Sequence, residues 1–350
     1  MPTWLQQLEA HWQQPQARTR LLDWLLRPLA AVYGAASARQ RAQYMHGKRA
    51  RTRLPVPTVV VGNVVAGGAG KTPVVIALTQ GMQRRGLQVG VISRGYGRQG
   101  TGCMHVTHSS SAQQAGDEPL MIAQATQAPV FVASTRAEAA LALLQAFPQT
   151  ELVICDDGLQ HWALERDCEV CVFPPWGVGN GRLIPAGPLR EPWPRAVDVI
   201  VQSLNEGEAT ASIPMPVPAA PCWHLSRQLA PVLHNGLGEQ RAFDALLQHP
   251  GPIVALAGIA KPQAFFAMLA QRGLRLSQTL ALPDHHAFTS LPVELRDANA
   301  DTLIVCTEKD AVKLWRLLPQ AWAVGLEVSW QEDWTDQVLS LARAHFHARS

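Results

Sequence analysis

Short apolar segments alternate with segments of helical periodicity over residues 54–205. Runs of apolar, mostly β-branched side chains predict buried strands, and apolar positions repeated every three or four residues predict the helices between them. The predicted strands are 58–62, 88–92, 129–133, 151–155, 168–173 and 197–202, and the predicted helices are 73–84 and 136–147. Because strands that alternate with helices build a parallel sheet, this pattern predicts an α/β fold with a mostly parallel sheet flanked by helices.

A polar and then proline-rich stretch, residues 206–221, interrupts the alternation. After it, the pattern resumes with predicted strands at 253–256, 274–280 and 303–306 and predicted helices at 262–271, 310–318 and from 333. An abrupt change of composition is typical of a linker between domains. We therefore expect residues 54–205 to form one domain and residues 222–350 to form a second, smaller α/β domain.

The composition excludes several classes of protein. The 350 residues are 47% hydrophobic and 16% charged, which is typical of a globular protein with a substantial core and not of a disordered or collagen-like chain. Six cysteines are too few for a disulfide scaffold. Cys168 and Cys171 lie on opposite faces of a predicted strand, so we expect core thiols in a reducing cytoplasm.

Residues 1–53 form a basic N-terminal segment. They carry nine basic and two acidic side chains, a net charge of +7, whereas residues 54–350 carry −4. Asp23 and Arg27 interrupt the apolar part, and the uncharged run 28–38 is shorter than the roughly 20 apolar residues that span a bilayer. We expect no membrane span and no signal peptide. The segment is interpreted either as an amphipathic helix on an anionic membrane surface or as a helix packed on the core, and the low share of charged residues favours the membrane.

Residues 62–73 are typical of a phosphate-binding loop, because they directly follow a predicted strand and directly precede a predicted helix. The glycines that let the backbone amides face an anion are Gly67, Gly68 and Gly70. Lys71 is placed to reach the β- and γ-phosphates, and the Thr72 hydroxyl is a ligand for Mg²⁺. The loop departs from the usual pattern at Val65, where a glycine is expected.

Two acids, Asp156 and Asp157, end the apolar strand that begins at residue 151. In phosphate-binding-loop enzymes an acid at such a strand end holds the metal, so both are Mg²⁺ candidates, although Asp-Asp-Gly is also a common turn. Transfer of phosphate to an alcohol further needs a proton acceptor, for which Asp117 and the segment 284–286 (Asp-His-His) are candidates. Cations that could clamp phosphate, or merely pair with surface acids, are Arg94, Arg98, Arg136 and Arg190.

Several motifs together resemble a known family. They are Gly-Asn-x-x-x-Gly-Gly-x-Gly-Lys-Thr-Pro at 62–73, Ser-Arg-Gly-Tyr-Gly-Arg at 93–98, Gly-Asp-Glu-Pro at 116–119, Asp-Asp-Gly-Leu-Gln-His at 156–161, Gly-Pro-Leu-Arg-Glu at 187–191, Asp-His-His at 284–286 and Thr-Glu-Lys-Asp at 307–310. In this order, over nearly the whole chain, they resemble tetraacyldisaccharide 4′-kinase, the membrane-associated lipid A kinase of Gram-negative bacteria. Val65 is shared with that family, whereas Ala69 and Leu159 depart from its common residues without removing a functional group.

The resemblance implies a P-loop NTPase-like fold and an activity. ATP with Mg²⁺ would phosphorylate the 4′-hydroxyl of tetraacyldisaccharide 1-phosphate, an acylated glucosamine disaccharide, to form lipid IVA in lipid A biosynthesis. The expected location is the cytoplasmic face of the bacterial inner membrane, as a peripheral or monotopic protein held there by residues 1–53. We expect a monomer.

The resemblance also implies residue roles. The nucleotide would be held by Gly67, Gly68, Gly70, Lys71 and Thr72, the metal by Thr72, Asp156, Asp157 and Glu191, and substrate phosphate by Arg94, Arg136 and Arg190. Asp117, paired with His285 of the second domain, would activate the sugar hydroxyl once the two domains close around ATP. Two choices stay open here, Asp156 against Asp157 as the metal ligand and His285 against His286 as the partner of Asp117.

The sequence leaves rival functions with less support. A P-loop GTPase or metallochaperone, acting as a nucleotide switch, needs an Asn-Lys-x-Asp motif, and residues 307–310 lack the spacer. A two-metal phosphoesterase built on residues 284–286 lacks the accompanying acid clusters. A module that only binds membranes leaves the phosphate-binding loop unexplained, and a net acidic chain beyond residue 53 disfavours nucleic-acid binding.

Overall fold

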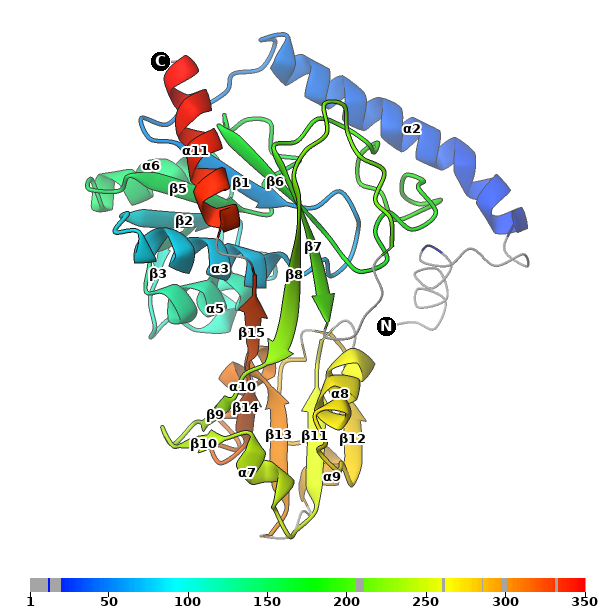
Figure 1. Ribbon diagram of the computed structural model, residues 1–350, viewed down its shortest axis with the longest axis vertical. Coiled ribbons are helices and arrows are strands. Elements are labelled where there is room, and N and C mark those ends of the chain that lie inside the picture. The colour runs from blue at the N-terminus through cyan, green and yellow to red at the C-terminus, as the bar shows by residue number, and fades with distance from the viewer. Residues whose placement is uncertain are drawn as a thin grey trace. The chain divides into compact units, whose positions relative to one another are not determined.

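The computed structural model describes residue 12 and residues 20–205, 211–259, 262–284, 286–296, 301–330 and 333–349. Contacts divide the chain into two compact units (Figure 1). The larger unit contains residues 2–226 and 330–350, and the smaller unit contains residues 227–329. The chain therefore crosses between the units at two places.

The larger unit contains the first sheet. Its strands are β1 (Thr58–Gly62), β2 (Val89–Ser93), β3 (Met104–Val106), β4 (Val130–Val132), β5 (Leu152–Asp156), β6 (Cys168–Phe173), β7 (Val199–Asn205), β8 (Cys222–Leu229) and β15 (Leu326–Ser329). The residues of β15 are counted with the smaller unit, but the strand pairs at the edge of this sheet. The strand order is β15-β8-β7-β6-β1-β5-β2-β4-β3. Strands β7, β6, β1, β5, β2 and β4 pair in parallel, and β3 pairs antiparallel with β4. Its helices are α2 (Arg20–Met45), α3 (Lys71–Arg84), α4 (Ala112–Ala115), α5 (Asp117–Thr126), α6 (Arg136–Ala146) and α11 (Asp333–Ala348). The predicted α/β fold with a mostly parallel sheet is confirmed.

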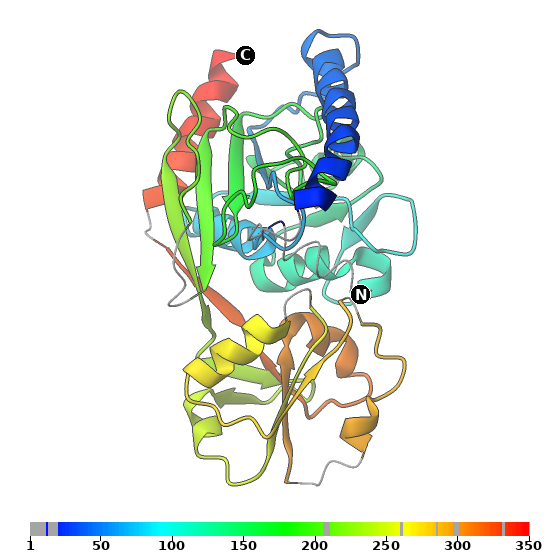
Figure 2. The same cartoon turned by 90° about the vertical axis from the view of Figure 1, so that its right-hand side faces the viewer.

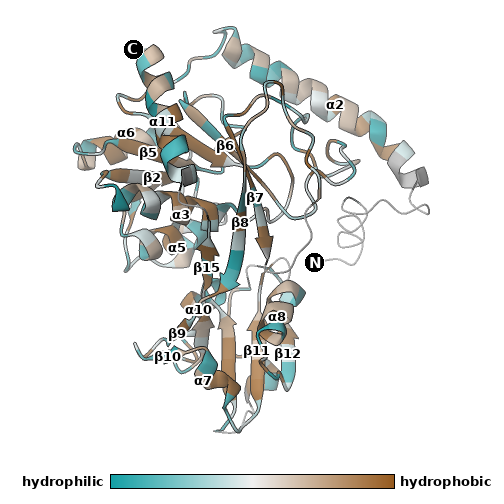
Figure 3. Cartoon of the chain, viewed as in Figure 1, coloured by the Kyte–Doolittle hydropathy of each residue, from teal (hydrophilic) through white to brown (hydrophobic). Residues whose placement is uncertain are grey.

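The central strands are buried along their whole length, which explains why they read as continuous apolar runs. Strand β1 lies between β5 and β6, with Val60 opposite Cys155 on one side and Glu169 on the other. Figure 3 shows the apolar character of β2, β5, β11 and β13. Because these strands run in parallel, the phosphate-binding loop after β1, Ser93 at the end of β2 and Asp156 at the end of β5 share the carboxyl edge of the sheet.

The last helix belongs to the larger unit, which differs from the expected second domain of residues 222–350. Helix α11 buries Trp334 and Thr335 completely, and a side chain at Gly81 of α3 would place its Cβ 2.8 Å from the Thr335 hydroxyl. Its His345 ring contacts the Asp167 carbonyl oxygen at 2.8 Å. Local composition marks linkers, but it does not show that a C-terminal helix packs against a domain far away in the sequence.

Helix α2 lies along the larger unit, apart from α11 in both views (Figures 1 and 2). It packs through Ala30, which is 8% exposed, and through Tyr33, whose hydroxyl donates to the Arg190 carbonyl oxygen at 2.8 Å. A different face leaves apolar side chains in solvent, namely Trp24 (67% exposed), Leu25 (56%), Leu29 (58%) and Val32 (69%). Within the described residues, no helix has the length and apolar character that a bilayer span requires.

The smaller unit has its own sheet and core. Strand order is β10-β9-β14-β13-β11-β12, from β9 (Val232–Asn235), β10 (Gln240–Ala242), β11 (Ile253–Ala257), β12 (Gln278–Ala281), β13 (Leu303–Thr307) and β14 (Trp322–Val324). Its helices are α7 (Asp244–Leu247), α8 (Pro262–Gln271), α9 (Val293–Arg296) and α10 (Glu308–Leu314). Strands β14, β13, β11 and β12 pair in parallel, whereas β9 pairs antiparallel with both β14 and the edge strand β10.

Candidate active site

The phosphate-binding loop joins β1 to α3 and leaves its backbone open. Gly67 and Gly70 have positive φ angles of 96° and 79°, a conformation that favours glycine, and Gly70 is the N-cap of α3. No atom lies within 4 Å of the place where a Cβ would stand at Gly67 or Gly68. The amide groups and the positive end of α3 are thus arranged as in a site for a phosphate.

The segment 187–191 lies beside this loop and brings two predicted site residues to it. Val65 forms an isolated antiparallel bridge with Leu189, and the Ala66 amide donates to the Pro188 carbonyl oxygen at 2.6 Å. The Arg190 amide donates to the Val64 carbonyl oxygen at 2.7 Å. Backbone pairing therefore explains why Arg190 and Glu191, more than a hundred residues from the loop, reach its vicinity.

Asp157 lies between two cations. Its carboxylate is 3.5 Å from Lys71 Nζ and 3.2 Å from Arg190 Nη1. Burial acts to raise the pKa of Asp157, but the positive charges of Lys71 and Arg190 outweigh it and hold the pKa below its usual value. Asp157 therefore stays ionised and keeps both cations at the loop.

Asp156 is in a different environment, although it is the neighbouring residue. It is 1% exposed, its Oδ2 accepts a hydrogen bond of 3.0 Å from the Ser93 hydroxyl, and its Oδ1 is buried with no hydrogen-bond partner in the described part of the chain. Burial raises the pKa of Asp156, and the nearby carboxylates of Glu118 and Asp157 raise it further. A buried carboxylate oxygen without a partner is costly, and a cation would relieve that cost.

These residues fit Mg²⁺. Among the described residues no three His, Cys, Asp or Glu side chains gather as a ready metal cage. Mg²⁺ at phosphate-transfer sites needs no such cage, because it keeps several waters and takes one or two protein oxygens together with phosphate oxygens. The free Oδ1 of Asp156 and the hydroxyl of Thr72 at the start of α3 supply oxygens of this kind.

Glu191 is held by neighbouring side chains. It is 4% exposed, its Oε2 is 2.9 Å from Arg195 Nε, and its Oε1 accepts a hydrogen bond of 2.7 Å from Gln160. The same Gln160 amide donates to the Asn63 carbonyl oxygen at 3.0 Å, and Lys71 Nζ donates to the Asn63 side-chain oxygen at 3.4 Å. The geometry thus places Glu191 in a polar chain that ends at the lysine of the loop.

Arg136 is bound to the turn that carries the two acids. It is 4% exposed, and its Nη2 donates to the Asp157 carbonyl oxygen at 2.8 Å. Its Nη1 contacts His161 Nε2, and burial, followed by the Arg136 charge, lowers the pKa of His161 to about 4, so this ring is neutral and accepts. Because Asp157 has a positive φ of 47°, which a non-glycine residue rarely adopts, Arg136 holds a strained turn in place.

The remaining predicted residues are less constrained. Arg94 is exposed after β2, and Arg98 donates to the Gly102 carbonyl oxygen at 2.7 Å. Asp117 is half-buried as the first residue of α5, with Gly116 as the N-cap. Its neighbour Glu118 acts electrostatically on Asp156, which assigns this helix start to the same edge of the sheet.

In the smaller unit, the predicted segment follows β12. Asp284 pairs with Lys309 at 3.3 Å, and the ring of His286 packs edge-on against Phe288 with 4.7 Å between centroids. His285 lies outside the described residues. Its pairing with Asp117 stays a prediction.

Sequence analysis missed four residues of the polar network. They are Asn63, Ser93, Glu118 and Gln160. Each lies inside a motif that was recognised, and two of them, Asn63 and Ser93, follow or end a buried strand. Asn63, Ser93 and Gln160 gave no chemical signal, because amides and hydroxyls are common beside strand ends in any α/β protein. Glu118 was overlooked because the neighbouring Asp117 accounts for the acid of its motif.

Comparison with known proteins identifies the family. A family model described as Tetraacyldisaccharide-1-P 4′-kinase matches residues 22–343. The tetraacyldisaccharide 4′-kinase of Acidovorax sp. (strain JS42) is 50% identical over 321 residues, which cover 92% of this chain and 90% of that protein. The enzyme of the same name from Neisseria meningitidis serogroup B (strain MC58) is 43% identical over 310 residues, covering 87% and 86%.

A solved structure agrees. The crystal structure of "apo" form LpxK from Aquifex aeolicus in complex with ATP superposes with a TM-score of 0.79 at 26% identity, covering 91% of this chain and 99% of that one. Fold, motifs and full-length similarity lead to one assignment. The chain belongs to the tetraacyldisaccharide-1-P 4′-kinase family.

Proposed function

We propose that this protein transfers the γ-phosphate of ATP to the 4′-hydroxyl of tetraacyldisaccharide 1-phosphate, forming lipid IVA. The observation that carries the proposal is the open phosphate-binding loop with Lys71 and Arg190 held next to it by Asp157, in a chain of the kinase family. The nucleotide-switch alternative is not favoured, because the relatives are kinases and a guanine-recognition motif is lacking.

The loop residues would bind and orient ATP. The amides around Gly67, Gly68 and Gly70 would face the phosphates, and Lys71 and Arg190 would turn from Asp157 towards the phosphate oxygens, where they neutralise the charge of the transferring group. Asp156 and Thr72 would hold Mg²⁺, which would supply neutralisation of the phosphate charge. Arg136 keeps the turn of Asp156 and Asp157 in its strained conformation and acts as a positioning residue.

Asp117 would accept the proton of the sugar hydroxyl. It begins α5 at the carboxyl edge, and His285 of the smaller unit is proposed as its partner, because a carboxylate orients an imidazole that titrates near neutral pH. The proposal requires the two units to come together around the substrates during turnover. His286 is the less suitable partner, since its ring packs against Phe288.

Helix α2 would hold the protein on the cytoplasmic face of the inner membrane. Its exposed apolar side chains, which include Trp24, Leu25 and Leu29, lie on a helix whose other face packs on the larger unit. A helix with one packed face and one exposed apolar face suits a peripheral membrane anchor. An acylated substrate is presented at such a surface.

The activity is tested by transfer of labelled γ-phosphate from ATP to detergent-solubilised tetraacyldisaccharide 1-phosphate. We expect a 4′-phosphorylated lipid from the wild type, about 10²–10³-fold less from Lys71→Ala and about 10²–10⁴-fold less from Asp117→Ala. ATP hydrolysis without lipid labelling would refute the substrate. Preference for GTP over ATP in a competition assay would favour the switch instead.

Membrane attachment is tested separately by vesicle flotation. The double variant Leu25→Ser/Leu29→Ser should lose most binding, since each buried leucine contributes about 1.5–3 kcal/mol. Leu141→Ser, on α6, removes an equally exposed leucine (55%) and is the matched control. Equal binding by both variants would contradict the role of α2.

A further inference from the structure

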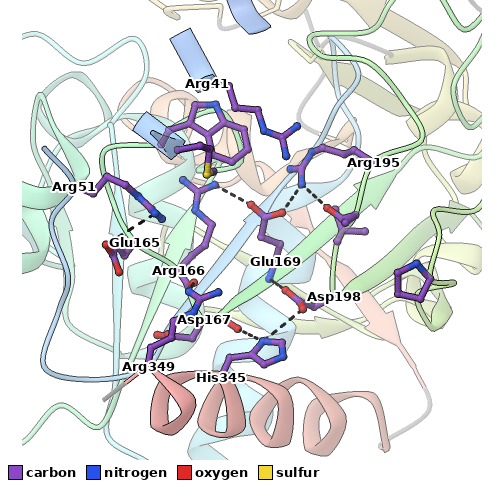
Figure 4. A pocket seen from close by; sticks show the side chains of 15 residues that line it. Arg41, Arg51, Glu165, Arg166, Asp167, Glu169, Arg195, Asp198, His345 and Arg349 are labelled. Carbon is purple, nitrogen blue, oxygen red and sulfur yellow. Dashed lines mark hydrogen bonds and ion pairs between the residues drawn. The ribbon is translucent and has the colours of Figure 1, made fainter. Parts of the chain in front are cut away.

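We propose that the larger unit has a second anion site, formed by Arg41, Arg195 and Trp162, that binds the phosphate group of a phosphate ester. The site is a cavity of about 440 Å³ and lies away from the phosphate-binding loop (Figure 4). Asp167, Glu169 and Asp198 line it at the amino ends of β6 and β7, whereas the loop follows the carboxyl end of the parallel strand β1. Strand length alone separates the two edges by about 15 Å.

Three guanidinium groups surround one indole ring in this cavity. The Cζ atoms of Arg41 and Arg166 are 4.7 Å from the centre of the Trp162 ring, and that of Arg195 is 5.6 Å from it. Trp162 is 6% exposed, so the ring itself is a buried platform. Stacking of this kind holds guanidinium groups at fixed positions and leaves their N–H groups available at the edges.

The acids around the cavity are already engaged. Glu169 pairs with both Arg166 and Arg195, and Glu165 with Arg51 at 4.0 Å. His345 is 3.6 Å from Asp198. The Asp167 carboxylate accepts the Thr58 amide at 2.9 Å.

Two donors are left over. In the described part of the chain Arg41 pairs with no carboxylate, and Nη2 of Arg195 is buried without a hydrogen-bond partner although that side chain is 6% exposed. Both guanidinium groups stack on the same Trp162 ring and line the same cavity (Figure 4). Arg195 already pairs with Glu169 and Glu191, so what it offers a ligand is the unused Nη2 donor, and Arg41 offers its charge. An oxygen anion in the cavity would accept from both side chains.

The walls identify the chemical class of the ligand. A phosphate group offers several charged oxygens to a pair of guanidinium forks, and Met45, Val197 and Pro218 provide apolar contact for a carbon chain attached to it. The shared chemistry is therefore a phosphate ester, either a phospholipid headgroup or a free metabolite. Arg41 lies on the same helix as the exposed apolar side chains of α2, which is where a headgroup would be met.

Calorimetric titration with two probes tests the site. The probes are glycerol 3-phosphate and dihexanoyl phosphatidylglycerol below its micelle concentration, and every protein carries Lys71→Ala so that the phosphate-binding loop does not contribute. We expect Arg41→Gln to weaken binding at least about tenfold. Arg39→Gln removes an exposed charge from the same helix and should leave binding unchanged.

The possible results distinguish a lipid headgroup from a free phosphate ester as the ligand, and they include results that overturn the proposal. Tighter binding of the lipid probe identifies a headgroup site, and equal binding of the two probes identifies a site for a free phosphate ester. Loss of binding in Arg39→Gln to the same degree, or no binding of either probe at millimolar concentration, overturns the proposal. If Arg41→Gln lowers the melting temperature, Arg41→Lys is used, which keeps the charge but loses the planar fork and should bind several-fold more weakly.

Discussion

The two edges of the large sheet use charge in opposite ways. At the carboxyl edge, Lys71 and Arg190 share the single carboxylate of Asp157 at 3.2–3.5 Å, on a loop whose backbone is open. At the amino edge, Glu169 is buried between Arg166 and Arg195 and each of its oxygens is taken. The Asp157 cluster leaves cations that a ligand can recruit, whereas the Glu169 cluster ties segments together. The same residue types therefore serve binding around Asp157 and stability around Glu169, where Arg41 and one donor of Arg195 remain for the proposed anion.

Breaking the amino-edge ion pairs should give the largest effect. Glu169→Gln leaves two buried guanidinium groups without their shared partner, and we expect the free energy of unfolding to fall by about 3–5 kcal/mol. Glu165→Gln, which disrupts the more exposed pairs with Arg51 and Arg53 at 4.0 and 3.8 Å, should cost at most about 1 kcal/mol. Urea unfolding of both variants measures the two losses of free energy. Similar losses would show that the buried ion pairs of Glu169 stabilise the fold no more than the exposed pairs of Glu165.

The carboxyl edge should respond in activity. We expect Asp156→Asn to lower the rate of lipid phosphorylation about 10²–10³-fold and to raise the Mg²⁺ concentration required, because its buried Oδ1 is the free oxygen at the site. Asp157→Asn, which only loosens Lys71 and Arg190, should cost roughly tenfold at unchanged Mg²⁺ requirement. Initial rates over a Mg²⁺ titration distinguish the two acids, and the reverse ranking would assign the metal to Asp157.

The buried imidazole at the carboxyl edge should make stability depend on pH. The pKa of His161 is about 4 in the folded chain against 6.5 for an ordinary histidine, so between these values the unfolded chain binds the extra proton. The resulting loss of stability, on the order of 3 kcal/mol, is absent above pH 6.5 and develops as the pH falls towards 4. Unfolding of the wild type and His161→Gln between pH 4 and 7 tests it, and parallel curves would contradict it.

The smallest effect concerns the glycines of the loop. Gly70 has a φ of 79°, so Gly70→Ala should cost about 1–2 kcal/mol of stability. Gly68 has open space at the Cβ position and no positive φ, and Gly68→Ala should change stability by less than about 0.5 kcal/mol. Thermal melting of the two variants measures the cost of backbone strain at Gly70. An equal decrease in melting temperature would contradict the prediction that the positive φ of Gly70 makes alanine unfavourable there.

Features formed by neighbouring residues could be predicted from the sequence, whereas features formed by residues far apart in the sequence could not. The phosphate-binding loop was recognisable because strand, glycines, Lys71 and helix are contiguous, so local geometry follows from local sequence. Arg136 was expected to clamp phosphate, and its actual partners, the Asp157 carbonyl and His161, come from another segment. Glu191 is expected at the metal, which stays a prediction, and the structure adds that its two oxygens contact Arg195 and Gln160.

The α/β pattern, the order of the motifs and the family follow from the amino-acid sequence, because periodicity and contiguous motifs are properties of neighbouring residues. Three other features emerge only from the folded chain: α11 packs on the larger unit, Asp156 and Asp157 differ in environment, and three guanidinium groups stack on Trp162. These features depend on which distant side chains share a buried volume. Burial and charge then set the behaviour of each group, and neither can be read from adjacent residues.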